Sequence, residues 1–195
     1  MPKECFISLP SDKQEKILAA ALQEFSLHVY VESSINQIIK EAGIPRGSFY
    51  QYFEDKEDLY FTLIEEILHV KLTHFLANRD SETSDDLFTF HESIFKFSLA
   101  LLSDDKYRFL FRNLFLSMNF HFNRKIKTII ENTRAEVLSG LKPQTTELTI
   151  KSDMLEITQL ITQELLLSKI VNNRTDEEIM IEYCRKLKLL KPESK

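Results

Sequence analysis

Apolar residues in the first part of the chain recur three or four positions apart, and short polar turns separate the periodic segments. The first segment runs from Ser11 to Phe25 and predicts a helix with one apolar face, which Ser11 or Asp12 can cap. Ser34 begins a second helix, because Ser34 and Gln37 have the spacing of a capping box. This helix is short, since Gly43 offers the left-handed conformation that ends many helices.

Two further helices follow the glycine. Pro45 can occupy the first position of a third helix, which extends over Arg46–Tyr52. Asp55 can cap a fourth helix that continues to about Ala77. The buried stripe predicted for this fourth helix consists of Leu59, Leu63, Ile64, Ile67, Leu68 and Leu72. The break at Gly43 is therefore a short turn between two short helices, which is the sequence form of a helix-turn-helix.

A polar patch, Asn78–Asp86, separates these helices from a region rich in phenylalanine. Helical patterning continues beyond it, and the expected segments are Asp85–Leu102, Asp105–Met118, His121–Leu138, Glu147–Asn172 and Asp176–Leu190. Only 3 glycines and 5 prolines occur in 195 residues, and no strand alternation is strong enough to build a sheet. We predict an all-α fold, with a three-helix helix-turn-helix module in residues 1–56 and a helical bundle in residues 57–195.

Composition argues against several classes of protein. Three glycines cannot supply the phosphate-binding loop of the common nucleotide hydrolases. Cys5 and Cys184 are too few and too far apart for a disulfide framework, which favours free thiols in a reducing cytoplasm, with a redox-sensing pair as the alternative. No stretch is long and apolar enough to span a bilayer, and the first residues lack the apolar run of a signal peptide. We therefore expect a cytoplasmic protein without a membrane partner.

Several sequence elements lie at characteristic spacing between Ile17 and Tyr60. They are ILAAALQEF in the first helix, a second helix that starts with serine and ends in AG, a short turn, GSFYQYF, and KEDLY. Together they resemble the TetR family of bacterial transcriptional repressors. Two positions depart from the family pattern: Val29 precedes Tyr30 where glycine is usual, and Pro45 stands where serine is frequent. The resemblance implies a DNA-binding regulator whose C-terminal helices bind a ligand and form a dimer.

The residues around the turn carry groups suited to DNA. A recognition helix presents donors near its N-terminal end to the major groove, and Arg46 offers a fork for a guanine edge or a phosphate. Gly47 permits close approach of the backbone, and Lys56 begins a helix whose N–H groups favour a phosphate. The predicted DNA-binding residues are Ser34, Arg46, Gly47, Ser48, Tyr50, Gln51, Tyr52 and Lys56. Phe49 and Phe53 are assigned to the core. The alternative is that all four rings are packing residues and the two cations are merely solvated.

Net charge opposes a simple nucleic-acid partner. The chain carries −5 at pH 7, and its isoelectric point is about 5.6. Through Tyr60 there are six basic and ten acidic residues, a net charge of −4. Affinity for DNA must then come from a local basic face, and it must fall with salt. We expect Lys40, Arg46 and Lys56 to share that face, with acids such as Asp58 elsewhere.

The second half of the chain suggests two further sites. A short recognition helix needs a partner copy for specificity, so a homodimer on paired half-sites is expected. The predicted dimer residues are Leu155, Leu160, Ile161, Leu165, Ile170, Ile179, Tyr183 and Leu187; the alternative is a buried helix in a monomer. The phenylalanine-rich region suggests a cavity for an apolar effector, although phenylalanine at helical spacing is also typical of solid core. Its predicted lining is Phe88, His91, Phe95, Phe111, Phe115, Met118 and Phe122.

Three functions are compatible with these patterns. The leading interpretation is a ligand-responsive regulator that binds a palindromic operator in double-stranded DNA as a homodimer. Its repressor role comes from the resemblance, and an activator would carry the same residues. The second is a helical adaptor protein that has lost DNA binding. The third is a bundle enzyme, disfavoured because Glu66 and His69 form only one of the two E-x-x-H pairs that a di-iron site needs. We therefore expect no enzyme activity, no metal and no cofactor.

Overall fold

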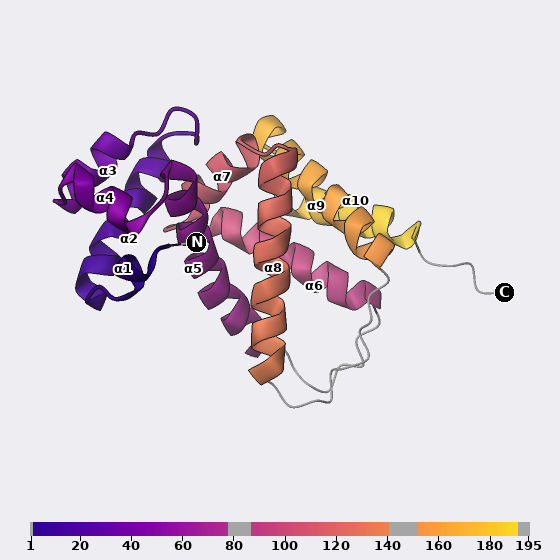
Figure 1. Cartoon of the computed structure of the whole chain (residues 1–195). Coiled ribbons are helices and arrows are strands. Elements are labelled where there is room, and N and C mark those ends of the chain that lie inside the picture. The colour runs from indigo at the N-terminus through magenta and orange to yellow at the C-terminus, as the bar shows by residue number, and fades with distance from the viewer. Residues whose placement is uncertain (1, 78–86, 141–151, 191–195) are drawn as a thin grey trace. The chain divides into compact units, whose positions relative to one another are not determined.

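The computed structural model describes residues 2–77, 87–140 and 152–190, and these residues form ten α-helices and no strand. The all-α class is thereby confirmed (Figure 1). Contacts divide the chain into two compact units. The N-terminal unit comprises residues 1–78 and 106–141, and the C-terminal unit comprises residues 79–105 and 142–195. The predicted functional boundary after residue 56 is a different kind of division and stays a prediction.

Five helices open the N-terminal unit. They are α1 (Glu4–Ile7), α2 (Ser11–Leu27), α3 (Ile35–Ala42), α4 (Arg46–Tyr52) and α5 (Lys56–Ala77). The predicted stripe of α5 is buried throughout, and Tyr60, Phe61 and Thr62 between its members are buried as well. The first half of α5 is therefore buried on several sides, as expected for a helix that other helices surround.

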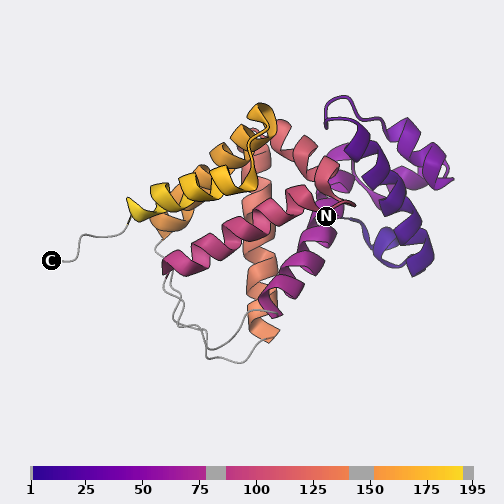
Figure 2. The same cartoon turned by 180° about the vertical axis from the view of Figure 1, so that it is seen from behind.

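The same unit includes α7 (Arg108–Leu116) and α8 (Phe120–Gly140). Helix α7 packs on α2, and α8 lies beside α5 (Figures 1 and 2). The buried amide of Asn113 donates to the carbonyl oxygens of Phe25 and Ser26, each at 3.0 Å, and so satisfies the C-terminal end of α2. Phe122 of α8 contacts the rings of Tyr60 and Phe61 at centroid distances of 5.9 and 5.0 Å.

The C-terminal unit consists of α6 (Leu87–Ser103), α9 (Ser152–Asn172) and α10 (Asp176–Lys188), and α6 contacts both of the others. Phe95 and Tyr183 stack face to face with centroids 3.8 Å apart, and the Tyr183 hydroxyl donates to the His91 carbonyl at 3.1 Å. Burial raises the pKa of Tyr183 to about 12. This stack fastens α10 to α6.

Two predicted helix caps are wrong. The structure places Pro10, not Ser11 or Asp12, at the N-cap of α2, without a side-chain cap. Ser34 makes no side-chain cap bond either, so its capping box with Gln37 does not form. The Asp55 cap of α5 is confirmed, because its carboxylate accepts from the Asp58 N–H at 2.8 Å.

The short helix α1 is absent from the sequence prediction, since four residues are too few for a periodic signal. Phe6 is its buried anchor, with its ring 4.7 Å from Phe53 and 6.3 Å from Tyr52. The Lys3 N–H donates to the Tyr52 carbonyl at 2.9 Å, and Lys3 Nζ donates to the Tyr50 carbonyl at 2.9 Å. Helix α1 therefore closes the C-terminal end of α4.

Replacing Phe6 should destabilise the chain more than its place near the end of the sequence suggests. Phe6→Ala removes a fully packed ring, and we expect a loss of about 3 kcal/mol in the free energy of unfolding by urea denaturation. The neighbouring Ile7 is 63% exposed, and Ile7→Ala should change stability by less than about 0.5 kcal/mol. Equal, small effects of the two substitutions would show that α1 does not hold α4.

Candidate DNA-binding site

A tight turn sets the angle between α3 and α4. Gly43 adopts φ 65° and ψ 34°, the left-handed conformation predicted for it, and the Ile44 N–H donates to the Ile39 carbonyl at 3.0 Å. Pro45 is the N-cap of α4, with ψ 147°, and not its first helical residue as predicted. Phe49 and Phe53 are fully buried, as assigned from the sequence. The α3–turn–α4 segment is thus a helix-turn-helix, with one face of α4 fixed by two aromatic anchors.

The N-terminus of α3 is held by a residue that the sequence analysis missed. Glu24 of α2 is buried, and its carboxylate accepts from the Ser34 N–H at 2.8 Å. A carboxylate at this position satisfies an unpaired helix N–H and complements the positive end of the helix dipole. In the sequence, the only sign of this role is that Glu24 is an acid on a helix face of otherwise apolar and small residues. Without the fold, an acid at that position is equally compatible with exposure to solvent.

Arg46 is preorganised at the start of α4. Its Nη1 donates to the Asn36 side-chain oxygen at 2.6 Å, and its Nη2 lies 3.5 Å from the Tyr50 hydroxyl. The guanidinium carbon is 5.8 Å from the centroid of the Tyr50 ring. Asn36, on α3, is therefore a second residue missed by the sequence analysis, because only the turn brings it to Arg46.

The predicted DNA residues divide into two groups by exposure. Arg46, Gly47, Tyr50 and Gln51 are exposed, and Tyr50 keeps 41% of its surface open. Ser34, Ser48, Tyr52 and Lys56 are half-buried. A Cβ added to Gly47 would meet nothing within 4 Å, so no contact within the described part of the chain explains this glycine. Without a side chain at Gly47, another molecule can approach the backbone closely at this position.

Lys56 is already engaged within the chain. Its Nζ donates to the carbonyls of Tyr30 and Ser33 at 2.7 and 2.9 Å and lies 4.5 Å from the Tyr30 ring centroid. Burial lowers the pKa of this ammonium, while the charge of Glu24 opposes that shift. Lys56 thus anchors the α2–α3 loop, and contact with a phosphate would have to share these donors.

A polar cluster joins α5 to α8 behind the loop. Glu57 Oε1 lies 2.8 Å from His121 Nε2 and 2.5 Å from Lys125 Nζ. Burial alone would raise the pKa of Glu57, but hydrogen bonds and charges from Lys125 and His121 outweigh it and lower the pKa. Tyr30 also reaches this region, since its N–H donates to Ser117 Oγ at 3.3 Å and its ring lies 5.0 Å from that of Phe122.

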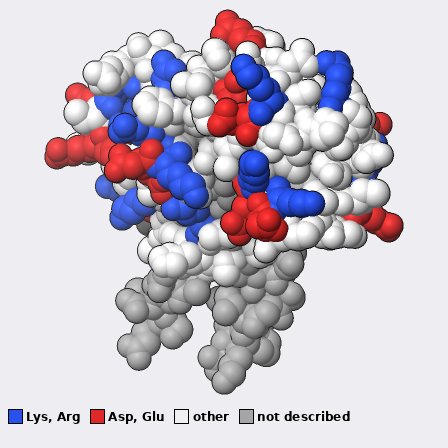
Figure 3. Space-filling model, turned by 90° about the vertical axis from the view of Figure 1, so that its left-hand side faces the viewer, with Lys and Arg blue, Asp and Glu red and all other residues white. Residues whose placement is uncertain are grey.

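Charges of both signs alternate on the face shown in Figure 3, and no uniformly basic surface covers it. Lys40 and Arg46 are both exposed, whereas Asp58 is half-buried and accepts from the Glu54 N–H at 3.0 Å. Lys40 and Arg46 therefore remain accessible to a phosphate. Any electrostatic attraction to DNA depends on single residues rather than on a broad field.

The predicted effector residues fall in both units. Phe111, Phe115, Met118 and Phe122 belong to the N-terminal unit, and His91 and Phe95 belong to the C-terminal unit. Four of the six are buried, while Phe115 and Met118 are half-buried. The side chain of Phe88 lies outside the described residues. The cavity itself stays a prediction.

The predicted dimer residues lie on α9 and α10. Leu165, Ile179, Tyr183 and Leu187 are buried within the single chain, and Ile161 and Ile170 are half-buried. Leu160 is 55% exposed. The side chain of Leu155 lies outside the described residues. Ile157, Val171 and Ile181 are further exposed apolar residues on these helices that are not among the predicted dimer residues.

The fold and the α3–turn–α4 geometry define a helix-turn-helix protein. Residues 17–63 match the family model described as "Bacterial regulatory proteins, tetR family". The resemblance seen in the sequence is therefore confirmed, and residues 17–63 form a TetR-family helix-turn-helix.

Curated relatives support the same segment. The chain is 46% identical over 57 residues to the HTH-type transcriptional regulator LmrA of Bacillus subtilis, covering 29% of this chain and 30% of that protein. It is 38% identical over 77 residues to the uncharacterised HTH-type regulator YxaF of the same organism, covering 38% and 39%. The matches span less than two-fifths of these relatives. Both relatives are named as HTH-type transcriptional regulators.

Solved structures extend the likeness of fold to most of the chain. A TetR regulator from Rhodococcus sp. RHA1 aligns with a TM-score of 0.63 and 15% identity, covering 93% of this chain and 97% of that one. FadR from Bacillus subtilis, in complex with stearoyl-CoA, aligns with a TM-score of 0.60 and 19% identity, covering 89% and 96%. At these identities the likeness shows the fold.

The described part of the chain lacks both a cluster of metal-ligating side chains and a membrane-spanning helix. No cluster of three His, Cys, Asp or Glu side chains in it could hold a metal ion. None of its helices is long and apolar enough to cross a membrane.

The depressed pKa of Glu57 makes part of the stability depend on pH. Because ionised Glu57 is favoured in the folded chain, its contribution is present above the ordinary carboxyl pKa and is lost as pH falls through the depressed value. Glu57→Gln should therefore destabilise the chain at pH 7 and cost progressively less as pH falls below about 4.5. Urea unfolding of both proteins across this range measures the difference. A constant difference at every pH would contradict the assignment.

Proposed function

We propose that the chain is a transcriptional repressor that binds a palindromic operator as a homodimer and releases it when an apolar effector binds. In this proposal residues 1–56 contact DNA, residues 57–195 bind the effector and form the dimer, and the protein acts in the cytoplasm. The observation that carries it is the TetR-family helix-turn-helix, whose α4 presents a preorganised Arg46.

The geometry of Arg46 supports direct reading of DNA. Its fork is already oriented by Asn36 and Tyr50, so less side-chain entropy is lost on binding. Its remaining N–H groups can meet a guanine edge or a phosphate. Tyr50 lies beside it, and Gln51 is exposed on the same helix; both side chains have polar groups suited to positioning contacts.

The C-terminal unit supports a homodimer. Ile157, Leu160 and Val171 on α9 and Ile181 on α10 are exposed apolar residues on the two helices predicted to meet a partner. Removing such side chains from water favours association, and a second copy offers the same surface. The buried residues of these helices then serve the protomer, while the exposed ones face the partner.

An effector response is supported by the contacts between the loop before α3 and α8. The Tyr30 carbonyl accepts a hydrogen bond from Lys56 Nζ, and the Tyr30 N–H donates one to Ser117 Oγ. The Tyr30 ring contacts the ring of Phe122. A shift of α7 or α8 would therefore disturb the loop that leads into the helix-turn-helix. Effector binding then acts as a population shift between two states of the dimer. The FadR structure with stearoyl-CoA shows that this fold accommodates an acyl ligand in that protein.

Arg46→Ala should weaken binding to the operator by roughly tenfold to a hundredfold, because it removes the main base or phosphate contact. Asn36→Ala should weaken it less, by about two- to tenfold, since it only frees the orientation of Arg46. Fluorescence anisotropy with duplexes from the upstream region of the coding sequence, or from random-sequence selection, measures both at two salt concentrations.

Circular dichroism and unfolding verify that each variant folds. Glu41→Gln is a matched control, because Glu41 is exposed on α3 and no DNA contact is assigned to it. If the wild type binds no selected duplex with competitor present, the regulator proposal fails and the adaptor interpretation takes its place.

Leu160→Glu should shift the dimer towards monomer without unfolding the chain. Leu160 is exposed in the protomer, so the charge is costly only when a partner covers it. Sedimentation velocity should show an increase in the dimer dissociation constant of tenfold or more. Leu165→Glu, at a buried position of the same helix, should instead lower thermal stability. An unchanged dimer in Leu160→Glu would move the interface elsewhere.

A further inference from the structure

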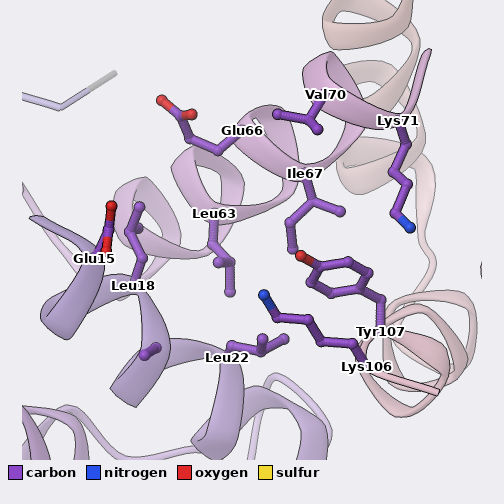
Figure 4. Close-up of a pocket in the computed structure, with 11 residues that line it drawn as sticks. Glu15, Leu18, Leu22, Leu63, Glu66, Ile67, Val70, Lys71, Lys106 and Tyr107 are labelled. Atoms are coloured by element: carbon purple, nitrogen blue, oxygen red, sulfur yellow. The ribbon is translucent and has the colours of Figure 1, made fainter. Parts of the chain in front are cut away.

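A half-open groove lies in the N-terminal unit, apart from every residue assigned above to DNA, effector or dimer. It has a volume of about 390 Å³ and is formed by α2, α5 and the segment that leads into α7. Figure 4 shows its lining, which consists of residues of α2 and α5 together with Lys106 and Tyr107.

The floor of the groove is apolar. Leu63 and Ile67 of α5 are buried beneath it, and Leu18 and Leu22 of α2 are half-buried at its wall. Val70, at its edge, is 63% exposed. Covering such a surface gains free energy in proportion to the apolar area removed from water. The volume is at the lower end of the range for small-molecule sites.

The charged groups around this floor are segregated. Lys71 Nζ and Lys106 Nζ lie 5.2 and 5.1 Å from the centroid of the same ring, that of Tyr107. Glu15 and Glu66 line the other side of the groove in Figure 4. The lining has equal numbers of acids and bases, and its two cations lie at one ring.

We propose that this groove binds a small amphiphile with an apolar body and one anionic group. The body covers Leu22, Leu63 and Ile67, and the anion lies at Tyr107 between Lys71 and Lys106. Charge complementarity selects the sign of the head group, because a cationic head would meet two ammonium groups and would be repelled. The acids on the opposite side fix the direction in which the ligand lies.

The location gives such a ligand a route to the helix-turn-helix. Helix α2 carries Glu24, which caps α3, and α5 begins at Lys56, which holds the α2–α3 loop. A ligand seated between α2 and α5 contacts both helices that support the DNA-binding pair. This consequence rests on the proposed function, whereas binding to the groove does not.

The chain has no tryptophan, so a single substitution provides a local probe. Tyr107→Trp keeps an aromatic face for the two lysines and places the only indole in the groove. Titration with sodium decanoate, kept below its micelle concentration, should give a saturable change in emission. Decylammonium, with the same alkyl chain and the opposite charge, should bind at least tenfold more weakly. Phe109→Trp, two residues away and outside the lining, is the control and should not respond to either.

Two variants in the Tyr107→Trp background separate the charge from the apolar floor. Lys71→Gln with Lys106→Gln should weaken decanoate binding by about tenfold and leave 1-decanol binding unchanged. Ala19→Phe, at an exposed position on the wall, should fill the groove and abolish binding of both. Circular dichroism confirms folding of each protein.

Equal affinity for decanoate and decylammonium, an unchanged affinity in Ala19→Phe, or no response of the groove indole would each overturn the proposal. These titrations contain no DNA, so their outcome is independent of operator binding. Adding decanoate to the operator complex then tests the route: release that Ala19→Phe prevents supports it, and release that persists in Ala19→Phe contradicts it.

Discussion

The N-terminal unit depends on a buried carboxylate and an ammonium that together hold the loop between α2 and α3. Glu24 accepts the first free N–H of α3, and Lys56 donates to two carbonyls of the same loop. Both groups are partly removed from water, and each is compensated by backbone partners as well as by the charge of the other. Loss of either would leave a buried polar group unsatisfied, which costs more than the bond itself contributes. The position of α3, and hence of the turn and α4, follows from these two residues.

The helices were largely predictable from the sequence because apolar periodicity, a glycine stop and an aspartate cap act locally. Gly43 and Asp55 behave as expected, since each decides a helix end through its own backbone or its nearest neighbours. The missed contacts all join one helix, or its cap, to another helix. Glu24 meets Ser34, Arg46 meets Asn36, and Asn113 meets Phe25 only after the chain has folded. Helix α1 escaped prediction because its stability comes from Phe6 packing on a distant helix rather than from its own four residues.

Residue type alone also could not show which apolar side chains of the C-terminal unit are buried and which are exposed. Leu160 and Leu165 are both leucines on α9, yet one is exposed and the other fully buried. Burial is set by which face meets α6 and α10, and that depends on the rotation of the helix in its unit. Aromatic residues pose the same problem, since Phe95 is occupied by its stack with Tyr183. An effector that reached Phe95 would have to replace that stack.

The N-terminal unit is discontinuous in sequence, because residues 79–105 belong to the C-terminal unit and the N-terminal unit resumes at residue 106. Asn113 and Phe122 come from the returning part, and they complete the end of α2 and the aromatic contacts of Tyr60. During synthesis, the five opening helices are made before α7 and α8. Until those helices arrive, the carbonyl groups at the end of α2 and the rings around Tyr60 stay open to water, and contacts this distant in sequence form slowly. The helix-turn-helix seems local in the sequence, yet the packing around α2 and α5 is complete only after Asn113 and Phe122 have been made.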